Sequence, residues 1–181
     1  MSTGTVTEYA GNYIYENDAL QFFSTPEGYA TPDGKGGFDY VYQYKDHLGN
    51  VRLSYTDVEG NLEIVEENNY YPFGLEHKGY NTAVSELGNS AAQRWKFGGK
   101  ESDESLGLKT YDFGARNYSP DLGRWINIDP LAEIMPSHSP YNYGFNNPIY
   151  FKDADGRSPK GFLNDPYLIF DGAKQNIHMG R

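Results

Sequence analysis

The residues of this sequence that could take part in chemistry are mostly carboxylates, because its 181 residues include 25 Asp and Glu but no Cys. Without cysteine there is no thiolate to act as a nucleophile or to bind a metal. No Ser-His-Asp set stands out as a triad, and the histidines lack the spacing of metal ligands. We therefore expect neither a metal nor a cofactor, and we interpret the histidines as residues of surface turns: His47, His77, His138 and His178.

One acidic motif, Asp153-Ala154-Asp155-Gly156, looks like part of a calcium loop. An EF-hand would need oxygen ligands at the first, third and fifth positions before the central glycine, and Phe151 occupies the first. That class of site is excluded, whereas a looser calcium site stays open. The run 98–100, Gly-Gly-Lys, is not a phosphate-binding loop, because the required spacing and the following Ser or Thr are absent.

The charge of the chain is acidic and uneven. A formal net charge of −10 argues against a surface for nucleic acid or anionic membrane. Residues 1–156 carry 11 basic and 23 acidic groups, a net charge of −12, whereas residues 157–181 carry 4 and 2, a net charge of +2. The change of sign indicates a boundary at Gly156. With neither a signal peptide nor a long apolar run, we expect no membrane span and interpret the chain as part of a longer exported protein.

The elements that would position these carboxylates are predicted to be short strands. The sequence has 17 Tyr and 10 Phe, which supply buried area and suit a pleated, half-wet surface, and its 21 Gly and 10 Pro supply turns. Residues 5–24 predict a hairpin that turns at Asn17-Asp18, and residues 26–37 predict an exposed loop. From residue 38 onward, aromatic and polar residues alternate in hairpin after hairpin. We therefore predict an all-β, antiparallel fold with little helix.

Three later segments have a different character. Residues 81–93 predict a loop with a short helix near Ala91 and Ala92, and strand character returns from Arg94. Residues 157–181 predict a linker and the truncated start of another domain, with a first strand at 167–170. The stretch from Tyr111 to Gly156 is interrupted by Gly, Pro, Asn or Asp every few residues, which is typical of short strands joined by tight turns.

Several motifs occur here in a fixed order. Residues 42–52 read Tyr-x-Tyr-x-Asp-x-x-Gly-Asn-Val-Arg, and residues 116–125 read Arg-x-Tyr-x-Pro-x-x-Gly-Arg-Trp. Asp129-Pro130, Asn146-Asn147-Pro148 and the acidic motif that ends at Gly156 follow. Together they resemble the Rhs/YD-repeat family of polymorphic toxins, and residues 38–156 resemble its YD repeats and C-terminal Rhs repeat-associated core domain. By this resemblance, residues 1–37 continue the shell and residues 157–181 begin the variable toxin region.

The resemblance implies a function. The repeats of this family curl into a hollow β-sheet shell around a C-terminal toxin domain, and the core segment closes one end. The expected partners are the rest of the shell, the toxin domain, a bacterial secretion apparatus and an immunity protein. The expected location is outside the producing cell or at its surface. Open sheet edges also predict self-association.

The resemblance further implies self-cleavage after the terminal Asp-Pro-x-Gly motif by paired aspartates. Carried over to this sequence, the pair is Asp129 and Asp153, and the scissile bond joins Gly156 to Arg157. One carboxylate would activate water while the other, protonated, would polarise the carbonyl. Arg124 is a candidate to hold a carboxylate through a bidentate contact.

The sequence departs from the family pattern in two ways. Ala154 replaces the proline, which relaxes the turn, and Arg157 stands where cleaving relatives carry Leu or Met. An alternative is therefore that Asp129 caps a turn ahead of Leu131 and that Asp153 and Asp155 shape the final turn. Likewise, Arg116 is expected to cover an aromatic face rather than to catalyse.

A different class of function also stays open. Exposed aromatic rings on a sheet can stack on sugars, so the chain is alternatively a carbohydrate- or surface-binding β module. The residues that would carry such binding are Trp95 and Trp125, although tryptophans of this kind more often pack inside.

Overall fold

The computed structural model describes residues 5–78, 87–104, 107 and 109–161. The chain divides into two compact units, of which unit 1 comprises residues 1–46, 50–69 and 77–96, and unit 2 comprises residues 47–49, 70–76 and 97–181. The strand expected at residues 167–170, residues 81–86 of the loop expected at 81–93, and His178 lie outside the described residues.

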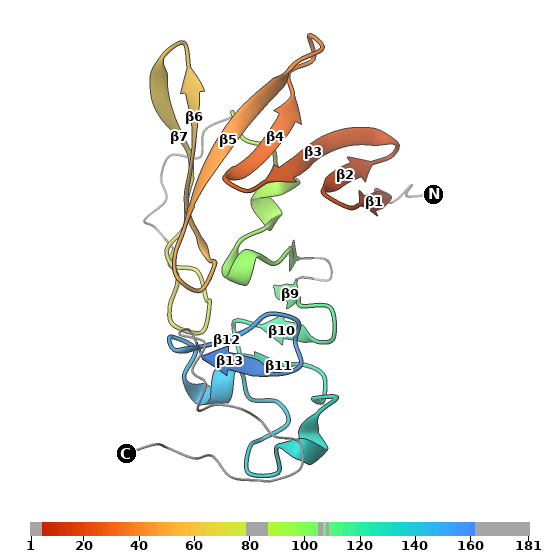
Figure 1. Ribbon diagram of the computed structural model, residues 1–181, viewed down its shortest axis with the longest axis vertical. Coiled ribbons are helices and arrows are strands. Elements are labelled where there is room, and N and C mark those ends of the chain that lie inside the picture. The colour runs from red at the N-terminus through yellow and green to blue at the C-terminus, as the bar shows by residue number, and fades with distance from the viewer. Residues whose placement is uncertain (1–4, 79–86, 105–106, 108, 162–181) are drawn as a thin grey trace. The chain divides into compact units, whose positions relative to one another are not determined.

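Unit 1 is built on a meander of seven antiparallel strands, each hydrogen-bonded to the next in chain order (Figure 1). Asn17 and Asp18, with φ of 49° and 66°, form the turn between the second and third strands, as the sequence predicts. The strands are β1 (Thr7–Ala10), β2 (Tyr13–Glu16), β3 (Ala19–Thr25), β4 (Gly28–Pro32), β5 (Phe38–Lys45), β6 (Val51–Val58) and β7 (Asn61–Glu67).

The prediction of an exposed loop at residues 26–37 is wrong for its first half, which forms β4. This strand pairs with β3 on one side and β5 on the other, and its residues Tyr29 and Ala30 are only 3% and 0% exposed. The glycine and proline content hides it, because Pro32 ends the strand and Gly28 fits where a Cβ would lie 2.0 Å from the carbonyl oxygen of Val41. Residues 26 and 27 form the turn between β3 and β4, and only residues 33–37 form a loop.

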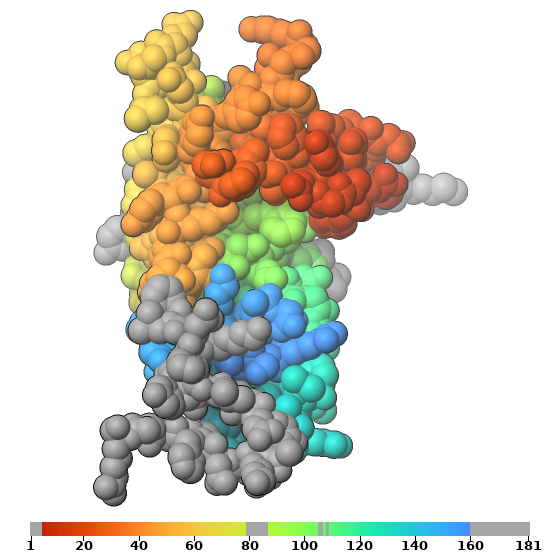
Figure 2. Space-filling model, viewed as in Figure 1, coloured from red at the N-terminus to blue at the C-terminus, as the bar shows by residue number. Residues whose placement is uncertain are grey.

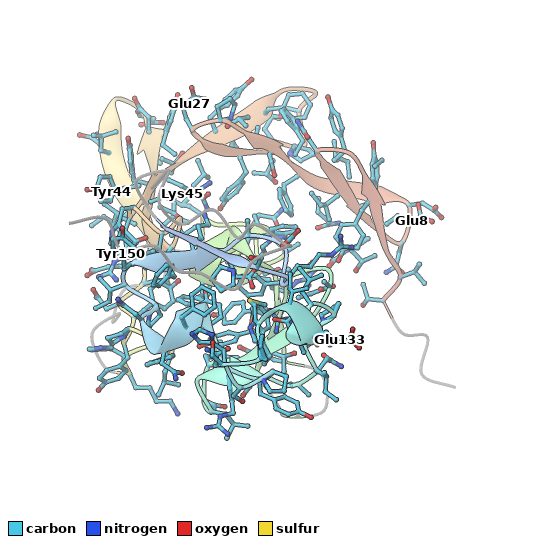
Figure 3. The ribbon with its side chains drawn as sticks, turned by 60° about the horizontal axis from the view of Figure 1, so that its bottom comes forward. Glu8, Glu27, Tyr44, Lys45, Glu133 and Tyr150 are labelled. Atoms are coloured by element: carbon cyan, nitrogen blue, oxygen red, sulfur yellow. The ribbon has the colours of Figure 1, made fainter. Side chains whose placement is uncertain are left out.

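The two faces of the unit 1 sheet differ in burial. Val41 is 2% exposed, whereas Tyr40 and Tyr42 on either side of it in β5 are 51% and 42% exposed. The covered face packs into a core of aliphatic and aromatic side chains: Ile14, Phe22, Tyr29, Val41, Val65, Ala91 and Ala92. Figure 3 shows Tyr44 and Glu27 at the outside of this sheet, and Figure 2 shows the β4–β5 loop and the β6–β7 turn as two separate projections of unit 1.

Unit 2 has shorter strands around an aromatic cluster. Its four-stranded sheet has the order β11-β10-β9-β8, and a separate hairpin pairs its last two strands. The core is almost entirely aromatic: Phe97, Tyr111, Phe113, Tyr118, Trp125 and Tyr143. The strands are β8 (Ser102–Asp103), β9 (Thr110–Asp112), β10 (Asn117–Ser119), β11 (Arg124–Trp125), β12 (Phe151–Asp153) and β13 (Pro159–Gly161).

Strand character does not return at Arg94, contrary to the sequence-based expectation. The segment forms two 3₁₀ turns, η1 (Ala92–Arg94) and η2 (Phe97–Gly99), and Gly98 and Gly99 have positive φ of 62° and 68°. Two successive left-handed glycines break an extended chain, so alternating hydrophobicity does not become a strand here. The short helix expected near Ala91 and Ala92 is present as η1. Two further 3₁₀ turns are η4 (Ala132–Ile134) and η5 (Gly144–Asn146).

The predicted fold class is confirmed, because the described residues form antiparallel sheets connected by turns and 3₁₀ helices of three residues. None of the helices in the described ranges is long and apolar enough to cross a membrane. The expected limits of the domains fall inside hairpins. The expected limit between residues 37 and 38 falls where the β4–β5 loop enters β5, and these two strands are paired at Pro32 and Phe38. The expected limit at Gly156 falls in the turn between the paired strands β12 and β13.

The aromatic cluster should dominate the stability of unit 2. We expect Phe97→Ala to lower the free energy of unfolding by about 3–5 kcal/mol, because it removes the ring of a residue that is 2% exposed and leaves a cavity. Urea unfolding measures the loss. The matched control is Leu122→Ala, at a side chain 70% exposed in the same unit, with an expected change below about 0.5 kcal/mol. Equal losses in the two variants would contradict a cluster-based core.

Candidate functional site

A buried arginine occupies the centre of the candidate site in unit 2. Arg116 is 2% exposed and lies in the tight turn between β9 and β10, which is closed by a hydrogen bond from the N–H of Phe113 to the carbonyl of Arg116. Its guanidinium stacks on Trp125, 4.2 Å from the ring centroid. The contact with an aromatic face agrees with the sequence-based expectation, but the ring provides only one of the contacts of this side chain.

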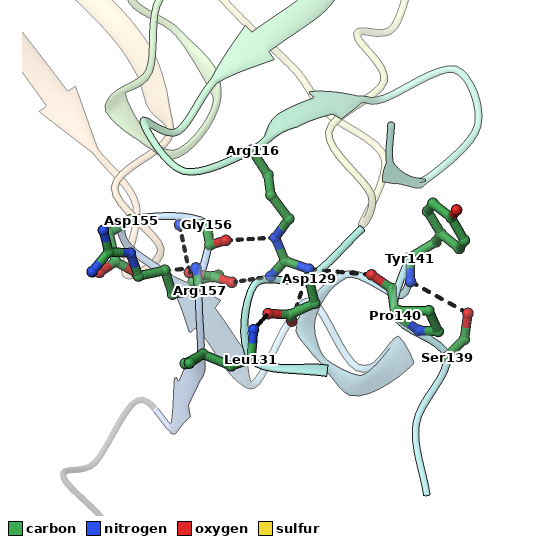
Figure 4. Close-up of polar contacts among 10 residues, drawn as sticks. Arg116, Asp129, Leu131, Ser139, Pro140, Tyr141, Asp155, Gly156 and Arg157 are labelled. Atoms are coloured by element: carbon green, nitrogen blue, oxygen red, sulfur yellow. Dashed lines mark hydrogen bonds and ion pairs between the residues drawn. The ribbon is translucent and has the colours of Figure 1, made fainter. Parts of the chain in front are cut away.

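The guanidinium of Arg116 also joins both predicted aspartates (Figure 4). Its Nη1 lies 2.8 Å from Oδ2 of Asp129, and its Nη2 lies 3.1 Å from Oδ2 of Asp153. All three side chains are buried, with 1%, 6% and 0% of their surfaces exposed. One cation between two ionised carboxylates leaves a buried net charge of −1, so the ion pairs compensate only part of the negative charge.

Asp129 divides its two oxygens between a turn and the arginine. Its Oδ1 accepts a hydrogen bond of 2.7 Å from the N–H of Leu131, so the turn-capping contact expected from the sequence is present. Its own N–H donates to the carbonyl of Pro140, which also accepts a hydrogen bond of 3.4 Å from Nη1 of Arg116. Capping therefore fixes the carboxylate and leaves Oδ2 directed at the guanidinium.

Asp153, the last residue of β12, is divided in the same way. Its Oδ1 accepts hydrogen bonds from the N–H groups of Gly156, at 2.8 Å, and of Arg157, at 3.1 Å. Its Oδ2 faces Arg116. The carboxylate thus holds the turn that contains the predicted scissile bond, and it touches the nitrogen that would leave.

Burial sets the protonation chemistry of this site. It raises the pKa of Asp153 above the ordinary value, against the opposing effects of Arg116 and of the backbone N–H groups of the turn. Burial also lowers the pKa of Arg116, against the opposing effect of the two aspartates. Asp153 therefore takes up a proton more readily than an exposed aspartate does.

Gly156 brings the carbonyl of the predicted scissile bond to the arginine. Its carbonyl oxygen accepts a hydrogen bond from Nε of Arg116, so the same guanidinium contacts this oxygen and both aspartates (Figure 4). The residue has a φ of +74°, and a Cβ there would lie 3.0 Å from the backbone nitrogen of Arg116 and 3.2 Å from Cβ of Phe113. Only glycine combines this conformation with so close an approach.

The two departures from the family pattern have local explanations. Without a proline at position 154, the turn is held by the two hydrogen bonds to Asp153 and by a third, of 3.1 Å, from the N–H of Arg157 to Oδ1 of Asp155. The Arg157 side chain is exposed, so its charge meets solvent. The pairing of Asp153 with Pro159 encloses the turn in a hairpin.

Arg124 is not part of this arrangement. It lies in β11 with an exposed side chain, and none of the ion pairs recorded among the described residues includes it. Arg116 takes the place that the sequence assigned to Arg124. Within the described ranges, no group of three or more His, Asp or Glu side chains could hold a metal ion.

Arg116 should stabilise the fold in a pH-dependent way. We expect Arg116→Met, which leaves two buried carboxylates without a cation, to lower the free energy of unfolding at neutral pH by about 3–5 kcal/mol. Loss of the cation raises the pKa of Asp153 further. Because the pKa of Asp153 would be higher in the folded than in the unfolded variant, proton binding at low pH stabilises the folded state. The loss of stability relative to the wild type should therefore shrink as the pH falls.

Urea unfolding between neutral and mildly acidic pH measures this effect, with Arg124→Met as the exposed control. We expect the control to change stability by less than about 0.5 kcal/mol at every pH. A deficit in Arg116→Met that does not depend on pH would contradict the role of the carboxylates.

Comparisons with known proteins relate the chain to segments of much larger proteins. No family model matches the sequence. Salivary gland surface protein 1 of Aedes aegypti is 31% identical over 157 residues, covering 84% of this chain and 4% of that protein. Toxin subunit YenC1 of Yersinia entomophaga is 32% identical over 122 residues, covering 67% and 11%. The tRNA(Glu)-specific nuclease WapA of Bacillus subtilis subsp. natto is 30% identical over 139 residues, covering 75% and 5%.

The fold has counterparts among solved structures. In the crystal structure of TcdB2-TccC3-Cdc42, one segment superposes with a TM-score of 0.61 at 24% identity, covering 84% of this chain and 8% of the other. At that identity the similarity concerns the fold alone. The chain spans between 4% and 11% of the length of the three relatives described above. The toxin subunits and WapA nucleases among its homologues are Rhs-type toxin proteins, which supports the family resemblance at that coarser level.

Proposed function

We propose that this chain is a wall and closing segment of an Rhs-type toxin shell, and that it cuts its own backbone between Gly156 and Arg157. One observation carries the proposal: the guanidinium of Arg116 contacts Asp129, Asp153 and the Gly156 carbonyl oxygen at once. The homology to toxin subunits and nucleases supports the association with a toxin.

The first requirement of peptide hydrolysis is an activated carbonyl. Arg116 donates from Nε to the Gly156 oxygen, and it is held there by two carboxylates and by the face of Trp125. A fixed, desolvated cation at the oxygen stabilises the negative charge that develops when water attacks the carbon. Arg116 would therefore act as the electrophilic residue.

The second requirement is a pair of groups that move protons. Asp129 takes a proton from the attacking water, whose oxygen forms the new bond to the Gly156 carbon. Oδ1 of Asp153 lies 3.1 Å from the nitrogen of Arg157 and accepts its N–H before the reaction. When the carbon becomes tetrahedral, this nitrogen gains a lone pair, and protonated Asp153 gives its proton to that lone pair as the peptide bond breaks. The products are a carboxyl group at Gly156 and an amine at Arg157, and exchange with solvent restores the two aspartates.

The wider setting of this function follows from the same proposal. The partners are the remaining turns of the shell and a toxin domain that continues from residue 157. Export occurs through a bacterial secretion apparatus, and an immunity protein protects the producer. In isolation, the edge strands β1 and β7 of the unit 1 sheet would favour self-association.

Self-cleavage should be visible in the purified chain. We expect intact-mass spectrometry to find a fragment that ends at Gly156, and Asp129→Asn and Asp153→Asn to slow its formation by about 10²–10⁴-fold, since each removes a proton-transfer group. Asp39→Asn, at an exposed carboxylate of β5 in unit 1, is the control and should cleave as the wild type does. A wild-type chain that stays intact, or an Asp129→Asn chain that is cut at the wild-type rate, would overturn the proposal.

The cleavage rate should also depend on pH. The reactive form needs a proton on Asp153, whose pKa is raised by burial. The protonated fraction falls as the pH rises through this pKa, so cleavage should be faster in mildly acidic buffer than in alkaline buffer. Fragment yield against time at a series of pH values measures the profile. A rate that increases steadily with pH would assign Asp153 a different role.

A further inference from the structure

A pocket of about 430 Å³ lies in unit 2 and is used neither by the ion-pair site nor by the aromatic core. It is formed by three turns: residues 71–75, residues 120–124 and residues 139–146. Its apolar wall is made of aromatic rings, prolines and leucines, and a volume of this size suits a small organic ligand. Tyr71 and Tyr141 both line the pocket, and these residues are 52% and 38% exposed.

The walls of this pocket are held in place by contacts that the ligand need not provide. The carbonyl of Phe73 accepts a hydrogen bond of 2.7 Å from the Tyr118 hydroxyl, and the N–H of Tyr71 donates to the carbonyl of Leu75. Gly123, with a φ of +65°, lies so close to Phe73 that a Cβ there would be 3.3 Å from the ring. A preformed pocket loses little conformational entropy on binding.

Besides Ser139, whose hydroxyl accepts a hydrogen bond of 3.4 Å from the N–H of Tyr141, four polar side chains border the apolar wall: Asp121, Arg124, Asn142 and Asn146. None of the hydrogen bonds or ion pairs recorded among the described residues uses any of these four side chains. The guanidinium donates hydrogen bonds, the carboxylate accepts them, and each amide does both, so together these groups can bind a ligand that has donors and acceptors side by side. The pocket therefore combines stacking surfaces with a set of uncommitted hydrogen-bonding groups.

The chemistry of these groups selects among ligand classes. The charges of Asp121 and Arg124 cancel, so the pocket favours neither a phosphate nor a polycation. An acyl chain is disfavoured, because its binding would remove water from the four polar side chains without giving them hydrogen-bond partners. A pyranose sugar offers an apolar C–H face for a tyrosine ring and hydroxyl groups that both donate and accept.

We propose that this pocket binds a neutral pyranose saccharide, with Tyr71 and Tyr141 as stacking surfaces and with Arg124 and the two asparagines on the hydroxyl groups. The tryptophans singled out in the sequence do not serve this purpose. Trp125 is 2% exposed beneath Arg116, and Trp95 packs against the core of unit 1. The saccharide site is independent of self-cleavage, although Ser139 and Tyr141 flank the Pro140 carbonyl that accepts from Arg116.

A glycan array probed with the full chain tests the proposal. We expect retention of neutral glycans with exposed pyranose units, and release by the corresponding free sugar. Tyr71→Ala and Arg124→Gln should each weaken binding by about tenfold, through loss of stacking and of hydrogen bonds. The matched control is Tyr44→Ala, which removes a tyrosine that is 66% exposed on unit 1 and should bind as the wild type does.

Three results would overturn the saccharide site: no glycan retained by the wild-type chain, equal binding by the Tyr71→Ala and Tyr44→Ala chains, or retention of acidic glycans alone. Saturation-transfer NMR of a retained sugar with the wild-type chain provides a readout without any substitution, and absence of transfer to its ring protons would also overturn the proposal. None of these outcomes depends on whether the Gly156–Arg157 bond is cut, so failure here and failure of self-cleavage remain distinguishable.

Discussion

A buried positive charge requires compensation, and meeting this requirement organises much of unit 2. Arg116 has almost no access to solvent, and its guanidinium reaches Asp129, Asp153, the carbonyls of Pro140 and Gly156, and the face of Trp125. Removing one partner of such a group costs several kcal/mol, because the charge left behind stays buried. The turn at 129–131, the segment around Pro140 and the hairpin at 151–161 must therefore converge before the arginine can be buried.

The same contacts explain how structural and chemical roles can share a residue. Asp129 caps a turn with one oxygen and holds Arg116 with the other. Asp153 holds the final turn with Oδ1 and the arginine with Oδ2. The two interpretations that the sequence left open are thus compatible, because a carboxylate fixed by a backbone N–H is also positioned for chemistry. The proposal of hydrolysis rests on the contact between the Gly156 carbonyl oxygen and the arginine.

The hairpins were predictable, because their signals are local. Asn17-Asp18 turns the chain, and the alternation in β5 separates exposed tyrosines from the buried Val41. The strand β4 was missed because its glycine and proline mimic a loop, although pairing with β3 and β5 outweighs that local preference. Arg116 was underestimated for the opposite reason: its partner Asp153 is 37 residues away, and only the tertiary fold brings the two together. Arg124 lies closer to Asp129 in sequence, but its side chain is on the exposed side of β11.

The hairpin of β12 and β13 places the proposed cut in a loop whose two arms are paired. Residues Phe151, Lys152 and Asp153 face Gly161, Lys160 and Pro159. Hydrolysis at the tip would open the loop and leave this ladder intact, with the new carboxylate on a guanidinium and the new ammonium beside two aspartates. Breaking the covalent bond and separating the two fragments would then be distinct events. The fragments would separate only when a force on the downstream chain broke the β12–β13 hydrogen bonds one pair after another.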